Sequence, residues 1–263
     1  MAPKTYSGNC HCGAIKFNVV LPIPIEEMGL NACDCSICTK KGYLFVFVRK
    51  ANVTFTKGAG TDGLGGGILV DYRFNSRMVC HRFCGRCGTP FGVVRPHMGA
   101  SEGFALNARM LMGVDLWSLD VEKFSGGAPW RPYNVPTYPK LKELLAQPLE
   151  DGEKIYHGSC HCGAVTFALK SPWSLDKAGP EGVENNHVQE CDCSTCIRSA
   201  GMFTYPRPLN RVSIHTTSPD AITTYVSPVG KGFGGEQFCS TCGVPLFQQL
   251  IGPPSGESCL GPS

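Results

Sequence analysis

Charged residues are scarce in this sequence, and it has no long hydrophobic run. Asp, Glu, Lys and Arg make up 17% of its 263 residues, and the formal net charge is only +3. No run of Lys or Arg exceeds two residues, as at Lys40 and Lys41, so the basic cluster typical of nucleic-acid binding is missing. The longest aliphatic and aromatic run, residues 43–48, is far shorter than the roughly 20 residues that cross a bilayer. We therefore expect neither a nucleic-acid nor a membrane partner.

The N-terminal segment also lacks the apolar stretch of a secretory signal. It reads MAPKTY, without an apolar region or a cleavage site. This predicts a cytoplasmic protein, in which cysteines are kept reduced. The sequence nevertheless contains 16 cysteines. Disulfides are disfavoured in that compartment, so metal ligation is the leading interpretation, and reduced cysteines that bind nothing are the weaker alternative.

The cysteines lie in a sequence that occurs twice. Residues 6–19 (YSGNCHCGAIKFNV) and 156–169 (YHGSCHCGAVTFAL) are identical at eight of 14 positions. The segment CDCSIC at 33–38 returns as CDCSTC at 191–196, and FCGRCG at 83–88 returns as FCSTCG at 238–243. Three clusters in the same order, twice, indicate a tandem duplication.

We predict a first repeat over residues 1–125, a linker over 126–155 and a second repeat over 156–263. The linker is rich in proline, which favours an extended chain, and a short helix is predicted within it over 140–147. Only 21 residues follow Cys242. The second repeat is therefore predicted to be shortened at its C-terminal end, either lacking closing strands or borrowing edge pairing from the first repeat.

The segments between the cysteine clusters have the composition of strands. They are rich in β-branched and aromatic residues and are separated by Gly, Asn or Asp, and no long stretch has helical periodicity. The predicted strands cover residues 14–20, 43–49, 52–56, 68–74 and 103–111 in the first repeat, and 164–169, 211–216 and 221–226 in the second. The expected fold class is mainly β, with two small, mostly antiparallel domains in tandem.

Each repeat carries seven clustered cysteines, in C-x-C, C-x-C-x-x-C and C-x-x-C motifs. Structural zinc is held by four thiolates, and catalytic zinc by three protein ligands beside one open position. The seven cysteines of a repeat can therefore supply one site with four ligands and one site with three. The three cysteines of C-x-C-x-x-C can converge on one ion from a single short loop, while the two distant pairs can join the start of the domain to later strands. Spacing alone does not show which clusters share an ion. An open three-thiolate zinc suits thiol or carbonyl chemistry.

The motifs resemble those of the glutathione-dependent formaldehyde-activating enzymes, a family related to the zinc-binding domain of centromere protein V. The resemblance rests on GSCHCGAV at 158–165, on C-x-C-S-x-C and on F-C-x-x-C-G-x-P, and it covers all three clusters in both repeats. It implies an Mss4-like β-tent fold with two zinc ions per domain, up to four per chain. The implied structural sites are Cys10, Cys12, Cys84 and Cys87, and Cys160, Cys162, Cys239 and Cys242. The implied open sites are Cys33, Cys35 and Cys38, and Cys191, Cys193 and Cys196.

The resemblance also implies an activity, that of a carbon–sulfur lyase of the S-(hydroxymethyl)glutathione synthase type. Such an enzyme would add glutathione, as co-substrate, to a small aldehyde at the catalytic cysteines Cys33, Cys35 and Cys38. A second hypothesis is a tailoring lyase or hydrolase that acts on a larger natural product, which predicts an apolar pocket wider than a formaldehyde adduct needs. A third is a non-catalytic zinc module, which predicts a fourth protein ligand at the three-cysteine site.

The two repeats differ beside their cysteines. Val244 stands where the first repeat has Thr89, and Glu236 stands where it has His81. Because the first repeat keeps more of the family pattern, we expect it to be the active one if only one is.

For most of the other histidines and cysteines we expect structural roles. His11 and His161, inside C-H-C, are expected to hydrogen-bond rather than to bind metal, and His81 is expected to be a buried strand histidine. His97 is considered as a pocket residue, and Cys80 and Cys259 as thiols outside the clusters.

Overall fold

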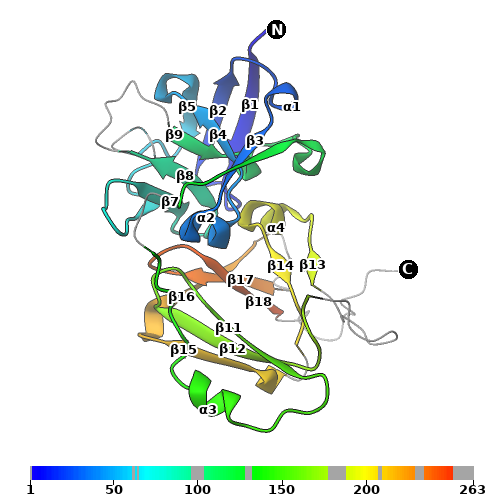
Figure 1. Ribbon diagram of the computed structural model, residues 1–263. Coiled ribbons are helices and arrows are strands. Elements are labelled where there is room, and N and C mark those ends of the chain that lie inside the picture. The colour runs from blue at the N-terminus through cyan, green and yellow to red at the C-terminus, as the bar shows by residue number, and fades with distance from the viewer. Residues whose placement is uncertain are drawn as a thin grey trace.

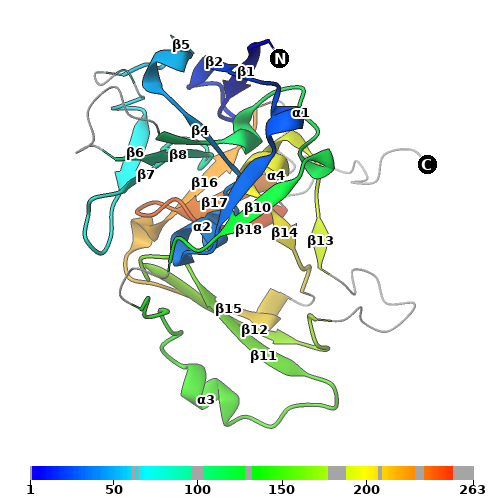
Figure 2. The same cartoon turned by 45° about the horizontal axis from the view of Figure 1, so that its top comes forward.

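The computed structural model describes residues 2–60, 63, 65–95, 104–127, 132–176, 188–206, 209–228 and 234–250 (Figures 1 and 2). Strands dominate, which confirms the predicted mainly β class. The α-helices of the described residues are short: α1 (Ile25–Met28), α2 (Ser36–Lys41), α3 (Leu141–Leu145) and α4 (Ser194–Ser199). No helix among these residues has the length and apolar character that a membrane span needs.

The first repeat consists of two sheets, in the upper half of Figure 1. A three-stranded antiparallel sheet has the order β1-β2-β5, formed by β1 (Lys4–Asn9), β2 (Lys16–Leu21) and β5 (Val53–Lys57). A seven-stranded sheet has the order β10-β3-β4-β9-β8-β7-β6. Its strands are β3 (Leu30–Cys33), β4 (Phe45–Val48), β6 (Leu69–Tyr72), β7 (Cys80–Cys84), β8 (Pro90–Val94), β9 (Phe104–Asn107) and β10 (Val121–Phe124). Only β10 and β3 pair in parallel in this sheet.

Strand β4 shows how the first repeat divides its side chains between two faces. Val46 and Val48 are buried in the core between the two sheets, where the rings of Phe17 and Phe91 meet edge to face at 6.1 Å. The alternate residues, Phe45 and Phe47, lie on the other face, because successive side chains of a strand point to opposite sides. That second face carries the cavity described below.

The second repeat has the same parts in smaller sheets. One contains β11 (Lys154–Ser159), β12 (Val165–Ser171) and β15 (Val212–Thr216); another contains β16 (Ile222–Val226), β17 (Gly234–Cys239) and β18 (Pro245–Leu250); the third contains only β13 (Gln189–Glu190) and β14 (Met202–Phe203). In the first repeat β9 joins β4 to β8, but no strand in the described part of the second repeat joins β14 to β18. The described strands of the second repeat pair only with one another.

Each predicted strand overlaps an observed one, but the segment predicted over 103–111 is a strand only over Phe104–Asn107 and then turns into a 3-10 helix, Ala108–Met110. The other observed strands, among them β1, β7, β8 and β17, were not predicted. The predicted linker helix is α3. Helices α2 and α4 were not predicted, because six residues are too few to show a helical period. The C-x-C-x-x-C segment is therefore a loop followed by a helix, not a single loop.

The two repeats face each other around an approximate two-fold axis. The histidine of each C-H-C motif hydrogen-bonds to a tyrosine of the other repeat and to the serine that begins helix α2 or α4 of that other repeat. The bonds join His11 to Tyr225 (2.9 Å) and Ser194 (3.0 Å), and His161 to Tyr72 (2.7 Å) and Ser36 (2.9 Å). Reciprocal contacts between equivalent residues are the mark of an isologous interface, here formed within one chain.

Equivalent residues meet each other where the axis passes. The rings of Phe83 and Phe238 contact edge to face with centroids 6.2 Å apart. Gly42 ends α2 and Ala200 ends α4, and a Cβ placed on Gly42 would stand only 2.2 Å from the Cβ of Ala200. The interface thus brings helices α2 and α4 together between the two halves (Figure 1).

Candidate functional site

The structure brings together four groups of cysteines, and they are the four groups expected from the sequence. In each group the Sγ atoms all lie within 4.8 Å of one another, so each group could hold a metal ion. The groups are Cys10, Cys12, Cys84 and Cys87; Cys160, Cys162, Cys239 and Cys242; Cys33, Cys35 and Cys38; and Cys191, Cys193 and Cys196. Their role as ligands remains a prediction.

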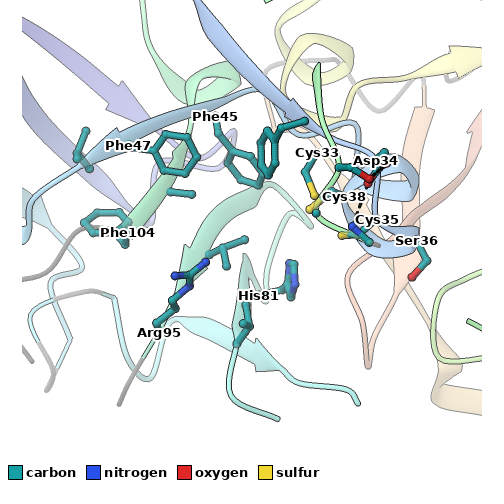
Figure 3. A pocket seen from close by; sticks show the side chains of 18 of the residues that line it. Cys33, Asp34, Cys35, Ser36, Cys38, Phe45, Phe47, His81, Arg95 and Phe104 are labelled. Carbon is teal, nitrogen blue, oxygen red and sulfur yellow. Dashed lines mark hydrogen bonds between the residues drawn. The ribbon is translucent and has the colours of Figure 1, made fainter. Parts of the chain in front are cut away.

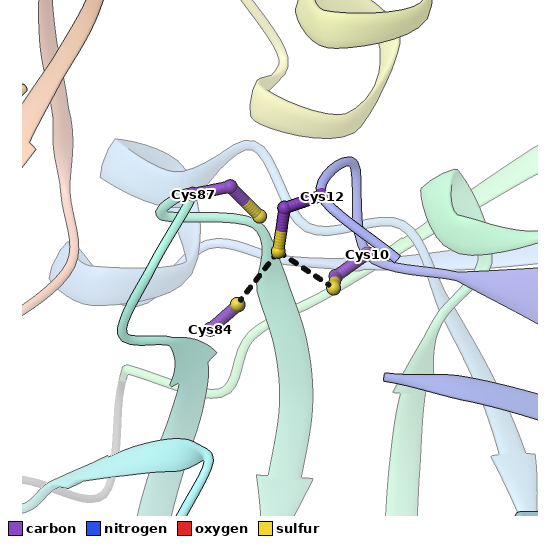
Figure 4. Close-up of side chains that lie close together, drawn as sticks. All are labelled: Cys10, Cys12, Cys84 and Cys87. Carbon is purple, nitrogen blue, oxygen red and sulfur yellow. Dashed lines mark hydrogen bonds between the residues drawn. The ribbon is translucent and has the colours of Figure 1, made fainter. Parts of the chain in front are cut away.

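The four-cysteine cluster of the first repeat is built from two tight turns (Figure 4). Cys10 and Cys12 come from the turn between β1 and β2, Cys84 ends β7, and Cys87 lies in the turn between β7 and β8. The Sγ atom of Cys12 lies 3.6 Å from that of Cys10 and 3.7 Å from that of Cys84. The backbone N–H of Ile15 donates a hydrogen bond to the Cys10 sulfur at 3.3 Å. The second repeat reproduces this arrangement, with Cys162 Sγ at 3.5 Å from Cys160 and 3.6 Å from Cys239.

These separations can be compared with the geometry of a tetrathiolate site. Zn–S bonds of about 2.3 Å in a tetrahedron place the sulfur atoms about 3.8 Å apart. The observed sulfur–sulfur distances of 3.5 to 3.7 Å are close to that value. The residues present therefore fit a four-coordinate ion in each repeat.

A buried lysine gives independent support for charged thiolates. Lys41, in α2, is completely buried, its Nζ has no hydrogen-bond partner among the described residues, and it lies 4.6 Å from the centre of the Phe83 ring. Burial lowers its pKa to about 8, and the charges that oppose this effect belong to cysteines, first Cys242 and then Cys38. An unpaired buried ammonium is costly. Metal–thiolate clusters with net negative charge on both sides would supply its counter-charge.

The three-cysteine cluster of the first repeat stands at the junction of β3 and α2. Cys33 is the last residue of β3, Cys35 is the N-cap of α2, and Cys38 lies inside that helix. Hydrogen bonds from the Cys35 and Cys38 thiols lower the pKa of Cys33, while hydrogen bonding to Cys33 and Cys35 raises the pKa of Cys38. Within the described parts of the chain, no fourth Cys, His, Asp or Glu joins this cluster. The fourth protein ligand that the hypothesis of a non-catalytic module predicts is thus not found among the described residues.

Asp34 holds residues 125–127, at the start of the linker, beside this cluster. Its carboxylate accepts hydrogen bonds from Ser125 Oγ (2.9 Å) and from the Gly127 N–H (3.0 Å). Between them, the Gly126 N–H donates to the Phe124 carbonyl oxygen at 3.1 Å, and its closeness to the Cys33 sulfur contributes to the lowered pKa of Cys33. A Cβ on Gly126 would stand 2.3 Å from that sulfur. Glycine is therefore required here by the close approach of backbone to sulfur.

We expect Gly126→Ala to weaken metal binding at the three-cysteine cluster of the first repeat. The added methyl would displace the Cys33 sulfur, and changes just outside a metal's ligand shell cost roughly 10–100-fold in affinity. Competition with a chromophoric chelator would measure the loss. Gly127→Ala is the matched control, since its Cβ would meet its nearest atom at an ordinary 3.4 Å. Equal zinc affinity in both variants would contradict this account.

A cavity of about 1200 Å³ opens beside the first three-cysteine cluster. It extends from Cys33, Cys35 and Cys38 past His81 to Arg95 and Phe104 (Figure 3). His81 lies buried on β7, as expected, and its Nδ1 has no hydrogen-bond partner in the described structure. Burial, with a smaller contribution from the Lys41 charge, lowers its pKa to about 3, so its imidazole is neutral at neutral pH.

The three-cysteine cluster of the second repeat has different surroundings. Cys193 is exposed, and Cys191 opens onto a hollow of about 440 Å³ together with Glu190, Asp192 and Tyr205. Glu236 takes the position of His81, and burial raises the pKa of its carboxyl to about 7. The two clusters have equivalent cysteines, but the pockets beside them differ.

His161 connects the interface between the repeats to the cavity of the first repeat. Its ring stacks on Tyr133 with centroids 4.4 Å apart and planes at 13°, and the Tyr133 hydroxyl donates to the His161 carbonyl oxygen at 2.7 Å. Phe74 contacts the same ring at 4.4 Å. Both Tyr133 and Phe74 line the cavity, and Ser36, bonded to His161, sits beside Cys35. The second repeat thereby supports the site of the first.

We expect His161→Ala to lower both stability and any turnover at the first cluster. The change leaves the buried Tyr72 hydroxyl without its partner, at a cost of about 1–3 kcal/mol in unfolding free energy. Denaturant unfolding and initial rates would measure the two effects. His11→Ala is the matched control, because it should cost similar stability while leaving turnover unchanged. Equal losses of turnover would show that the effect is general destabilisation.

The remaining candidates take the following places. Cys80 is buried in β7 outside all four groups. His97 and Cys259 lie outside the described residues. Lys41, Gly126, Tyr72 and Tyr133 were not predicted from the sequence as functional residues. Only Tyr72 carried a signal, since it and Tyr225 occupy equivalent strands, β6 and β16, of the two repeats.

A comparison with protein families matches both repeats of the chain. The sequence model of the family described as "Glutathione-dependent formaldehyde-activating enzyme" matches residues 5–108 and again 155–258. A Halomonas elongata protein, provisionally named a glutathione-dependent formaldehyde-activating enzyme, is 31% identical over 93 residues, which are 34% of this chain and 55% of that protein. The chain thus spans about half the length of this curated relative. A crystal structure of a Rhodobacter sphaeroides protein matches at 28% identity and a TM-score of 0.37, covering 45% of this chain and 99% of that one.

Proposed function

The chain belongs to the glutathione-dependent formaldehyde-activating enzyme family, and from that premise we propose that it joins a thiol to an aldehyde at Cys33, Cys35 and Cys38. In the proposed reaction a carbon–sulfur bond forms between the thiol sulfur and the carbonyl carbon. The π electrons of the carbonyl move to its oxygen, which takes up a proton, while the thiol loses one. No electrons are gained or lost overall, so no redox partner is needed. Glutathione is the proposed thiol.

The proposed cofactor is zinc, with up to four ions per chain. Each four-cysteine cluster would hold a closed structural site, because four thiolates satisfy a tetrahedral zinc. Each three-cysteine cluster would hold an ion with one open position. When bound there, zinc supplies a Lewis acid that favours the thiolate form of a thiol or polarises a carbonyl.

The residues of the chain position the reactants around this cluster. Asp34 holds the linker backbone against Cys33 on one side, and His161 fixes the start of α2 on the other. The neutral imidazole of His81 lies along the cavity wall. A substrate that fills the cavity would displace water from it, which strengthens electrostatic interactions inside it.

The observation that carries the proposal is the cavity itself. The cluster of Cys33, Cys35 and Cys38 opens into about 1200 Å³, whereas the equivalent cluster of the second repeat borders a hollow of about 440 Å³. This contrast supports the first repeat as the active one. The cavity also favours the second hypothesis, a tailoring enzyme for a larger carbonyl substrate, since formaldehyde needs little of that volume.

The test is thiol addition by zinc-replete protein. NMR would follow formation of the hydroxymethyl thioether from glutathione and formaldehyde against the uncatalysed rate. We expect acceleration that saturates with glutathione. A rate equal to the uncatalysed one, for formaldehyde and for larger aldehydes alike, would overturn the proposal.

A further inference from the structure

The cavity lies on one face of the seven-stranded sheet, and the strand register shows which residues share that face. Phe47 pairs with Ala105, Ala105 with Val93, Val93 with His81, and His81 with Tyr72, so one row of side chains crosses β4, β9, β8, β7 and β6. Directly paired residues project from the same side of a sheet. The cavity floor is therefore a continuous sheet surface and not a gap between loops.

Aromatic rings follow one another around this surface. Phe124 contacts Phe47 at 6.3 Å between centroids, Phe47 contacts Phe45 at 6.4 Å, and Phe45 stacks on Tyr43 at 4.7 Å. On the opposite side Phe74 contacts His81 at 5.8 Å. Such walls suit a flat, π-rich ligand, since aromatic rings gain from stacked and edge-to-face contact beyond the area they bury.

Two of these rings are unusually open to solvent. Phe47 is 55% exposed and Phe124 is 37% exposed, and both line the cavity. Neighbouring exposed aromatic side chains mark binding sites rather than ordinary surface. An apolar ligand lying along β4 would cover both.

The two ends of the cavity differ in charge. At the cysteine end lies Asp34, whose carboxylate already accepts hydrogen bonds from Ser125 and Gly127. At the other end Arg49 and Arg95 line the cavity, and Figure 3 shows the Arg95 side chain pointing toward the aromatic residues. Arginine both stacks on aromatic faces and binds carboxylates through its planar donors.

Strand geometry sets the length of the ligand. Arg49, the extended residue that follows β4, lies four residues beyond Phe45, which at about 3.3 Å per residue is about 13 Å. The volume of about 1200 Å³ exceeds the roughly 1000 Å³ at the upper end of ordinary small-molecule pockets. A one-carbon aldehyde beside the cysteines would leave the arginine end empty.

From the sheet-face cavity, its aromatic walls and its two arginines, we propose that the carbonyl substrate is a flat aromatic compound with a carboxylate or similar anion at the end far from its carbonyl. The carbonyl would lie near Cys33, Cys35 and Cys38, the rings along Phe45 and Phe47, and the anion between Arg49 and Arg95. This inference rests on the proposed function and specifies its substrate class.

The first test measures binding without reaction. 2-Naphthoate and its neutral counterpart 2-naphthamide would be titrated by their fluorescence. We expect the anion to bind at least about tenfold more tightly, as a charge-assisted hydrogen bond provides. Arg49→Gln with Arg95→Gln should reduce this preference to about onefold, whereas Lys57→Gln, an exposed charge on β5, should leave it unchanged. Equal binding of both probes to the wild type, or a preference that survives in the double variant, would overturn the proposal.

The second test separates this inference from the proposed function. With glutathione present, 6-formyl-2-naphthoate should show a higher kcat/KM than 2-naphthaldehyde or formaldehyde, and Cys35→Ser should abolish turnover while still binding 2-naphthoate. Arginine-dependent binding without turnover of any aldehyde would sink the proposed function and leave the binding site standing. Turnover of formaldehyde without selective naphthoate binding would overturn the inferred substrate class and leave the proposed function standing.

Discussion

Replacing Cys84 with serine is expected to prevent the first repeat from folding. Cys84 belongs to the four-cysteine cluster that joins the β1–β2 turn to the β7–β8 turn, and so links the two sheets. Binding of a structural zinc contributes on the order of 10 kcal/mol, which is comparable to the whole stability of an ordinary domain. Losing one of four ligands removes much of that contribution. Circular dichroism, amide NMR dispersion and zinc content per chain would record the loss.

Cys80→Ser is the control for that experiment. Cys80 is on the same strand, β7, and is equally buried, but it belongs to no cysteine cluster. Burying a hydroxyl in its place should cost only about 1–3 kcal/mol in unfolding free energy and leave the zinc content unchanged. If Cys84→Ser folded with the same zinc content as Cys80→Ser, the four-cysteine cluster would not be a structural metal site.

Cys35→Ser is expected to give the largest loss of activity in a folded protein. Cys35 caps α2 without making a side-chain capping bond, so the fold does not depend on its sulfur. Removing a ligand should exceed the roughly 10–100-fold cost of disturbing an outer-shell partner, so we expect turnover to fall by at least about 100-fold. One zinc per chain should be lost while the melting temperature changes little. Steady-state rates, metal analysis and calorimetry would measure the three quantities.

Cys193→Ser makes the same change in the second repeat. Cys193 is the N-cap of α4, the equivalent of Cys35 at α2. We expect this variant to lose one zinc as well but to keep its turnover, because the cluster of Cys191, Cys193 and Cys196 has only the smaller hollow beside it. Comparable losses of activity in both variants would show that the second repeat is also active.

The three-cysteine groups could be predicted from the sequence because their C-x-C-x-x-C spacing is local and occurs twice. The four-cysteine groups join pairs that are distant in sequence, and their pairing was expected from the family resemblance and not from spacing. The cavity could not be predicted, although Phe45, Phe47 and Arg49 alternate visibly along one strand. Alternation identifies two faces of a strand but not which of them another layer covers. That depends on Val46 and Val48 packing against the smaller sheet, which is a tertiary contact. The same holds for His161, whose partners Ser36 and Tyr72 are distant in sequence.

The close contact between Gly42 and Ala200 restricts which repeats can pair with each other. A first repeat could pair with another first repeat, since glycine would then face glycine. Two second repeats could not pair in this way, because two methyl groups would stand about as close as the 2.2 Å found for a Cβ on Gly42. Pairing second repeats from separate chains is thus sterically disfavoured. Pairing of a first repeat with a second repeat, as within this chain, therefore has the advantage over assemblies in which like halves pair with each other.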